Sequence, residues 1–545
     1  MVELRPVSGP SVISSPAIVT DAIKEERPLL SDPSNVIEPA NSLHNSLTIA
    51  KHKAELAKVR HQIIEQLSVK AQKSSSPEKI ILPNGLTIIA DKIPDTEFCH
   101  VIVAVKAGAV HEKKTTRGIA HFIEHNVFKG TTSEGRETEK AINIELEGLG
   151  TAEKSNASTD SETTMYYSEV LGGFAPYVLD VLLDILCNPR FNEGDIEKEK
   201  GVVKEEIKMY RDDPRDFLRD HLHYNVWKHP LGKPVLGTRK SVSSLNRAEM
   251  LEFVNSNYTP DNMIVSVAGN FDFDKIVEVA NTHTAHITKR KKEREIPELK
   301  YKPGTSIFKR RDIEQTHLIF ATEGVNFTSD DWHTLEVLEK SLTLLSSSRL
   351  WSGIRGNEGL AYTVTSERTE YSKGGTFSIY TAIPGEKLDF VLTLILTQLK
   401  DIKDNGLKEE ELEIAKINLI TEYVRDNESL EERAQRNITD EVYFGKSSTL
   451  KDDIDKIQQV TNEKIINLIN KMFRPELISL FIMGPEVDDD KEQQDAENIG
   501  RLPTRQKLQA IIDKFAKDWD KPKTAEITEP PSPQPPTTLA EPKAA

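Results

Sequence analysis

Residues 121–131, HFIEHNVFKGT, place two histidines and a glutamate among apolar neighbours. His121 and His125 are four positions apart, so on a helix their imidazoles project from one face and can bind a single ion. Imidazole is a common zinc ligand, and two helical histidines supply half of a tetrahedral zinc site. Glu124 lies roughly 60° from His121 and roughly 100° from His125 around such a helix. It therefore borders the ion without having to bind it, and it can accept a proton from water there.

A purely structural explanation of this stretch is a polar helix face with two hydrogen-bonded histidines. The apolar flanks argue against that explanation, because they predict a mostly buried helix: Ala120, Phe122, Ile123, Val127 and Phe128. Two buried histidines beside a buried carboxylate need charge compensation, which a cation supplies. The order H-x-x-E-H is also the inverse of the zinc-binding order H-E-x-x-H and allows the same division of roles. We therefore expect a metal centre on this helix.

The composition limits the classes of protein to consider. A chain of 545 residues has room for two to four domains, and 37% apolar residues suffice for real cores. The formal charge of −16 argues against general phosphate clamping, so no nucleic-acid partner is expected. Two cysteines cannot form a disulfide framework. No apolar stretch reaches 18 residues, so we expect no membrane span. The acidic N-terminus favours a cytoplasmic location, with an organellar matrix as the alternative.

A second stretch, EGDIEKEKGVVKEEIKMY (193–210), predicts a long helix with acidic residues beside apolar ones. Glu199 and Glu206 are seven apart and share a face with Val202 and Val203, whereas Glu205 lies about 100° away from Glu206. Metal binding would explain carboxylates on an inward face. A helix rich in glutamate and lysine is equally typical of a solvated surface with ion pairs. The residues alone leave both interpretations open.

Strand, turn and linker patterns divide the chain into five parts. These are an N-terminal extension with one amphipathic helix (1–77), an α+β domain (78–288), a linker (289–299), a second α+β domain (300–486) and an acidic, proline-rich tail (487–545). The first domain opens with a hairpin around Asn84-Gly85. The second domain repeats the order of strand, loop and helix, with Leu335, Leu338 and Leu342 where the first has its histidines. We therefore expect two related halves, only one of which binds a metal.

These features resemble the pitrilysin-like family of inverted-motif (HxxEH) zinc metallopeptidases. The nearest branch is that of the mitochondrial processing peptidase β-type subunits and their bacterial relatives. Three further stretches are similar to family patterns: IEKEKGVVKEE from Ile196, YNVWKHPLGKPVLGT (224–238) and SSSRLWSGIRGNEGLAYTVTSE (346–367). The resemblance covers roughly residues 78–486 and neither terminal extension.

The resemblance implies one Zn²⁺ per chain, bound by His121, His125 and a distal glutamate. It places that ligand at Glu206, with Glu199 as a supporting carboxylate. The spacing from His125 is a few residues longer than the common family value, so Glu205 is the alternative ligand.

The resemblance also implies roles in peptide hydrolysis. Glu124 would be the general base, and Arg355 and Tyr362 would hold the substrate carbonyl. The family fold is α+β, with two related domains that each have an antiparallel sheet flanked by helices. Two such domains form half of a clamshell chamber, so the implied partners are a peptide substrate and a second subunit, in a homodimer or a heterodimer. The alternative function is that of a non-catalytic scaffold subunit with the same fold.

Overall fold

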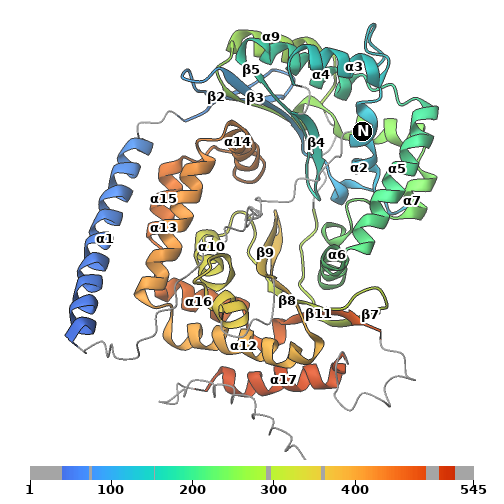
Figure 1. Ribbon diagram of the computed structural model, residues 1–545. Helices are drawn as coiled ribbons and strands as arrows, with labels where there is room; N and C mark the ends of the chain where they lie inside the picture. The colour runs from blue at the N-terminus through green and yellow to red at the C-terminus, as the bar shows by residue number, and fades with distance from the viewer. Residues whose placement is uncertain are drawn as a thin grey trace, which may run out of the picture.

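Two β-sheets, one in each half of the chain, organise the fold (Figure 1). The computed structural model describes residues 40–72, 76–151, 154–289, 296–356, 363–486 and 502–521, without the side chains of 40–50, 72, 355 and 356. The strands of the first sheet are β1 (Glu78–Ile81), β2 (Thr87–Lys92), β3 (Phe98–Val105), β4 (Ser155–Thr159), β5 (Thr164–Leu171) and β6 (Met263–Gly269). Those of the second sheet are β7 (Thr305–Arg310), β8 (Thr316–Glu323), β9 (Thr363–Tyr371), β10 (Gly374–Ile383) and β11 (Ser479–Pro485).

The two sheets share one topology. The first has the strand order β1-β2-β6-β3-β5-β4 and the second the order β7-β11-β8-β10-β9. With β1 set aside, both therefore place their strands in the chain order first, fifth, second, fourth, third. In each sheet the first and fifth strands are parallel, and the other neighbouring pairs are antiparallel. The expected two related α+β domains are thus confirmed, and each sheet has one parallel pair besides the antiparallel pairs that we expected.

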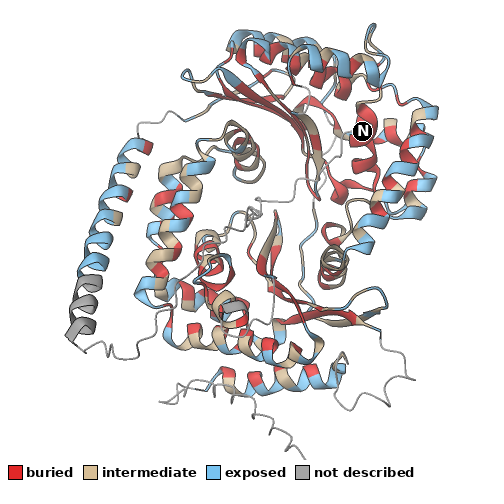
Figure 2. Ribbon diagram, viewed as in Figure 1, coloured by how far each residue is buried: buried red, intermediate tan, exposed pale blue. Residues whose placement is uncertain are grey.

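Helices pack on these sheets. The first domain contains α2 (Ile119–Val127), α3 (Glu139–Gly148), α4 (Ala175–Cys187), α5 (Glu193–Asp212), α6 (Pro214–Trp227), α7 (Arg239–Ser244), α8 (Arg247–Asn257) and α9 (Phe273–Thr284). The second contains α10 (Trp332–Glu339), α11 (Arg349–Trp351), α12 (Leu388–Asn405), α13 (Glu409–Asp426), α14 (Leu430–Phe444), α15 (Leu450–Gln458), α16 (Asn462–Met472) and α17 (Arg505–Trp519). Figure 2 shows burial concentrated in the strands and in α2 and α4. Because α4 lies between the first sheet and α9, ten of its 13 residues are buried, and all of these except Asp184 are apolar.

Helix α14 belongs to the second domain in sequence but packs on the inner face of the first sheet (Figure 1). Ala434 and Ile438 of α14 join a core cluster with strand residues that include Ile102 and Ile264. Beside this cluster, Arg433 forms a bidentate ion pair with Asp91 of β2, with both N–O distances at 2.7 Å. This helix therefore fixes the two domains to each other.

The terminal elements pack against the second domain. Helix α1 (Ala40–Gln72) places Ile64 in the core of that domain, whereas Leu56, Val59 and Ile63 are exposed. Helix α17 buries Trp519 and neighbouring apolar side chains in the same core. The second domain therefore extends beyond the boundary that we expected at residue 486. None of the helices that the structure describes has the length and apolar character to cross a bilayer.

Replacing Arg433 with leucine tests the contact between α14 and the first sheet. We expect the free energy of unfolding to fall by about 3–5 kcal/mol, because the buried Asp91 carboxylate loses its guanidinium partner. Urea titration followed by tryptophan fluorescence measures this change. The matched variant Arg425→Leu removes an exposed arginine of α13 and should change stability by less than about 0.5 kcal/mol. Equal losses in the two variants would contradict the role given to the ion pair.

Candidate metal centre

The start of α2 is fixed by two close backbone approaches. Gly118 precedes the helix with φ +85°, and a Cβ there would lie 2.6 Å from the carbonyl oxygen of Leu236. Gly237 faces it with φ +73°, and a Cβ there would lie 2.8 Å from the Cα of Gly118. These contacts explain why YNVWKHPLGKPVLGT lies beside the histidine helix. Only glycine at both positions lets the two segments come this close without strain.

A buried carboxylate also holds this helix end. Glu112 accepts hydrogen bonds from the N–H groups of Gly118 (2.9 Å) and Ala120 (3.1 Å), which are free donors at a helix start. Burial raises the pKa of Glu112 to about 8, while the two backbone donors act in the opposite direction. Glu112 therefore positions the helix, and it was not among the residues that we predicted.

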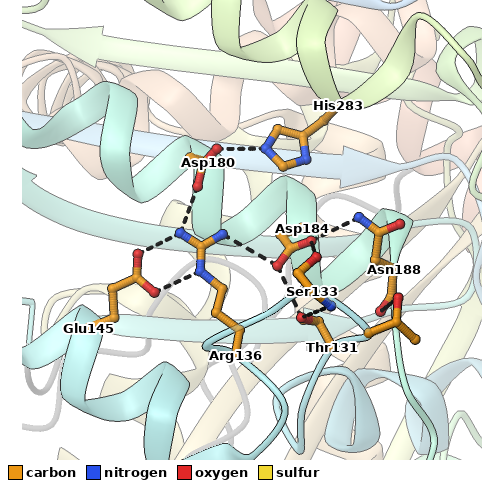
Figure 3. A network of polar contacts seen from close by, with 9 residues as sticks. Thr131, Ser133, Arg136, Glu145, Asp180, Asp184, Asn188 and His283 are labelled. Atoms are coloured by element: carbon orange, nitrogen blue, oxygen red, sulfur yellow. Dashed lines mark hydrogen bonds and ion pairs between the residues drawn. The ribbon is translucent and has the colours of Figure 1, made fainter.

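The segment after α2 is held by a polar network (Figure 3). Thr131, the last residue of HFIEHNVFKGT, donates a hydrogen bond to the buried Asp184 of α4 (3.1 Å). Arg136 contacts Glu145 of α3, Asp180 and Asp184, so one guanidinium joins the loop to two helices. The helix with the two histidines is thus anchored at both ends.

The side chains of His121, His125 and Glu206 converge. The two Nε2 atoms are 3.3 Å apart, and each lies 3.6 Å from Oε2 of Glu206 on α5. Ligand atoms at the zinc bond length of about 2.0–2.1 Å in a tetrahedron are about 3.3 Å from one another. The observed triangle is close to that size, so one ion fits between the three atoms without a large rearrangement. Among the described residues, this is the one group of His, Cys, Asp and Glu whose ligand atoms gather in this way.

Glu199 orients the second histidine. Its Oε1 lies 2.9 Å from Nδ1 of His125, which leaves Nε2 of that ring for a metal when Nδ1 carries the proton. Burial opposes the charged form of His125, but Glu199 and the nearby carboxylates outweigh it and raise the pKa. Lys129 Nζ lies 3.3 Å from Oε2 of Glu199. Burial favours the neutral form of Glu199, yet His125 and Lys129 hold its pKa below the usual value.

Two buried atoms of these side chains lack a hydrogen-bond partner. Glu206 Oε2 and His121 Nδ1 are buried and have no hydrogen-bond partner. Burial lowers the pKa of His121 well below its usual value, and burial raises the pKa of Glu206. A cation between Oε2 of Glu206 and the two Nε2 atoms would satisfy this carboxylate oxygen, so the residues present fit a zinc ion.

Glu124 borders this cluster. Thr159 at the end of β4 donates a hydrogen bond to Oε2 of Glu124. Burial raises the pKa of Glu124 to about 7, against the opposing effects of His125 and the Thr159 hydroxyl. A carboxyl group with a pKa near neutrality can both accept and return a proton under physiological conditions.

The structure brings together five of the residues singled out in the sequence: His121, Glu124, His125, Glu199 and Glu206. The alternative ligand Glu205 is exposed on α5. Val202, which we expected on the face of Glu206, is exposed as well, whereas Val203 is buried. The side chains of Arg355 and Tyr362 lie outside the described residues, so their roles stay predictions.

Two polar contacts of the centre were missed in the sequence. Thr159 and Lys129 act through partners 35 and 70 positions away, and no short-range pattern identifies such pairs. The single available signal for Lys129 is its place in the HFIEHNVFKGT stretch.

The centre opens into a cavity of about 2050 Å³ between the two domains. Edge strands line it from both sides, β4 with residues 156–159 and β9 with residues 366–371. Helices α13 and α14 contribute further lining residues. A chain of several residues has room in a space of this size.

The second domain has an ion-pair cluster where the first has the metal cluster. On α10, which follows β8 as α2 follows β3, Glu336 and Glu339 are buried beside the predicted leucine stripe. Arg368 of β9 contacts Glu339 at 2.7 Å and Glu336 at 3.1 Å, and lies over the ring of Trp332. Our sequence analysis did not predict Glu336 and Glu339 at this place. The guanidinium of Arg368 compensates their negative charge.

Comparison with known proteins places these observations in a family. Residues 87–239 match the family model described as insulinase (peptidase family M16). Residues 244–419 match the model described as peptidase M16 inactive domain. The metal cluster lies within the first of these matches, and the Arg368 cluster lies within the second.

Individual relatives cover most of the chain. An uncharacterized zinc protease of Bacillus subtilis, YmxG, is 32% identical over 392 residues, which are 72% of this chain and 94% of that protein. The mitochondrial-processing peptidase subunit beta of Saccharomyces cerevisiae is 28% identical over 74% of this chain and 90% of its own length. The crystal structure of a protease from Helicobacter pylori has a similar fold, with a TM-score of 0.68, 21% identity and coverage of 75% and 99% of the two chains. The chain therefore belongs to peptidase family M16, the pitrilysin-like family that its sequence resembles.

Proposed function

We propose that this chain is a zinc-dependent metalloendopeptidase that cleaves peptides or processes peptide precursors. The convergence of His121, His125 and Glu206 within 3.6 Å, with Glu124 beside them, is the observation that carries the proposal. These three side chains would hold one Zn²⁺ per chain, and Glu199 would orient His125. Zinc bound there would act as a Lewis acid and would lower the pKa of a water molecule to about 7.

Glu124 would move the proton. Its Oε2 is held by Thr159, so we assign Oε1 to accept a proton from the attacking water and to deliver it to the leaving amine. Burial raises the pKa of Glu124 to about 7, so the carboxyl group can both accept and release a proton at neutral pH. By resemblance to the family, Arg355 and Tyr362 would hold the substrate carbonyl and stabilise its developing negative charge.

The substrate would bind as an additional strand along β4. This strand is at the edge of the first sheet, and its last residue, Thr159, contacts the proposed general base. Backbone hydrogen bonds to an edge strand hold a peptide with few demands on its sequence. The cavity lining carries 18 aspartates and glutamates against 11 lysines and arginines, which favours peptides with basic side chains.

A non-catalytic scaffold is the second function for this fold. A scaffold subunit has no use for three converging ligand atoms, one of them without a hydrogen-bond partner, and a carboxyl group beside them. The donor set of the first domain is complete in the described residues, so no specific observation favours the scaffold.

If Glu124 is the general base, its replacement should sharply lower turnover and leave metal binding intact. We expect Glu124→Gln to keep zinc but to lower kcat by about 10²–10⁴-fold, since it loses the proton acceptor and keeps the shape. His121→Ala should lose zinc as well as activity. Zinc content by atomic spectroscopy and cleavage of a fluorogenic peptide library measure both effects. Wild-type cleavage by Glu124→Gln would contradict the assignment.

The identity of the third ligand is tested by two neighbouring glutamates. We expect Glu206→Ala to weaken zinc affinity by at least about 100-fold, beyond the usual effect of a residue that only supports a ligand. Glu205→Ala removes an exposed carboxylate of the same helix and serves as the matched control. Competition with a chromophoric chelator measures both affinities. A larger effect of Glu205→Ala would reverse the assignment.

The assembly is part of the proposal. Two domains enclose half of the family's chamber, so we propose a homodimer, or a heterodimer with a related subunit. Light scattering of the purified chain should give about twice the monomer mass of 61.3 kDa, or this mass alone with activity appearing only after a partner is added. A fully active monomer would rule the assembly out.

A further inference from the structure

A second cavity, of about 520 Å³, lies on the outside of the junction between the two domains. It forms where the C-terminal end of α5 and the start of α7 meet the edge strand β7. Five cationic side chains line it, and Asp212 is the one acidic residue in the lining: Lys208, Arg211, Arg239, Lys309 and Arg310. Lys208, Arg211 and Arg239 belong to the first domain, and the other two cations belong to the second.

Most of this positive charge is uncompensated. Arg310 is paired with Asp312, and its Nη1 donates to the carbonyl oxygens of Arg211 (3.2 Å) and Asp212 (2.9 Å). The other four cations form no ion pair with any described residue. With Asp312 and Asp212 set against the five cations, the pocket keeps a net charge of +3. This concentration of positive charge stands out in a chain with a formal net charge of −16.

The base of the pocket is apolar. Phe217 and Phe308 meet edge to face with their ring centroids 5.0 Å apart, and Met483 behind them is fully buried. An apolar base lowers the local dielectric constant, so an anion in the pocket is attracted more strongly than on an open surface. Arginine adds paired donors that match phosphate oxygens, and lysine adds point charges.

We propose that this pocket binds a compact anion with several phosphate groups, such as a triphosphate. A single carboxylate or chloride would compensate one charge and would leave two cations unpaired. The cavity has room for a di- or triphosphate group, and its cations approach from both domains. An inorganic polyphosphate and a nucleoside triphosphate share this chemistry.

An anion in the pocket would link the two domains through α5, the helix that carries Glu206. Lys208 and Arg211 lie on α5 within five residues of Glu206, and Lys309 lies on the facing strand β7. A bound anion would therefore brace α5 against the second domain and raise the temperature of unfolding. This binding is independent of peptide cleavage, so it can fail while the proposed peptidase activity stands.

Isothermal titration of the full chain with tripolyphosphate at 150 mM salt, a condition chosen to screen weak surface attraction, tests the site. We expect saturable binding at one site per chain, weakened at least about tenfold in the double variant Arg239→Ala/Lys309→Ala. The control Lys240→Ala removes the neighbouring exposed lysine of α7, which is outside the pocket, and should bind as the wild type does. All three proteins keep the same metal ligands, so chelation of metal by the anion contributes equally to each.

A parallel titration with ATP separates the two sources of phosphate. Binding of ATP with similar affinity supports the site with a nucleotide as ligand, and binding of tripolyphosphate alone supports it with an inorganic ligand. Absence of saturable binding by the wild type, or equal affinity in the double variant and the wild type, would overturn the proposal.

Discussion

The convergence of three lone pairs in a buried place is the constraint on which the first domain depends. Two imidazole nitrogens and one carboxylate oxygen lie within 3.6 Å of each other, and burial disfavours the charges that could attract them. Other contacts must therefore hold them together before an ion arrives. Glu112 and the facing glycines fix the start of α2, the Arg136 network fixes the segment after it, and Glu199 links α5 to His125. These contacts hold the three ligand atoms at the spacing that a metal site requires.

The repeated topology shows that the fold itself does not require a metal. Both sheets place their five common strands in the same order, and a helix follows the second strand in each. In the first domain that helix presents His121 and His125, whose Nε2 atoms face a carboxylate oxygen of Glu206. In the second it presents Glu336 and Glu339, which the guanidinium of Arg368 compensates from an adjacent strand.

Sequence periodicity was sufficient for the parts of the site that lie on one helix. The spacing of His121 and His125, with Glu124 between them, required no knowledge of the fold. Choosing Glu206 over Glu205 was different, because helical spacing alone did not show which side of α5 is buried, and the resemblance made the choice. The Asn84-Gly85 hairpin and the long helix over 193–210 were also predicted. The contact of Thr159 with Glu124 and the position of α14 depend on residues far apart in the chain, which local patterns do not reveal.

The position of α14 has a consequence for how the chain is made. Gly269 ends the first sheet, and Leu430 begins the helix that covers its inner face, so 161 positions separate the two. During synthesis the sheet leaves the ribosome with Ile102, Ile264 and their apolar neighbours uncovered. Late, long-range closure of this kind slows folding and exposes surfaces that associate wrongly. The N-terminal half therefore leaves one apolar face of its sheet open to solvent until α14 has been synthesised.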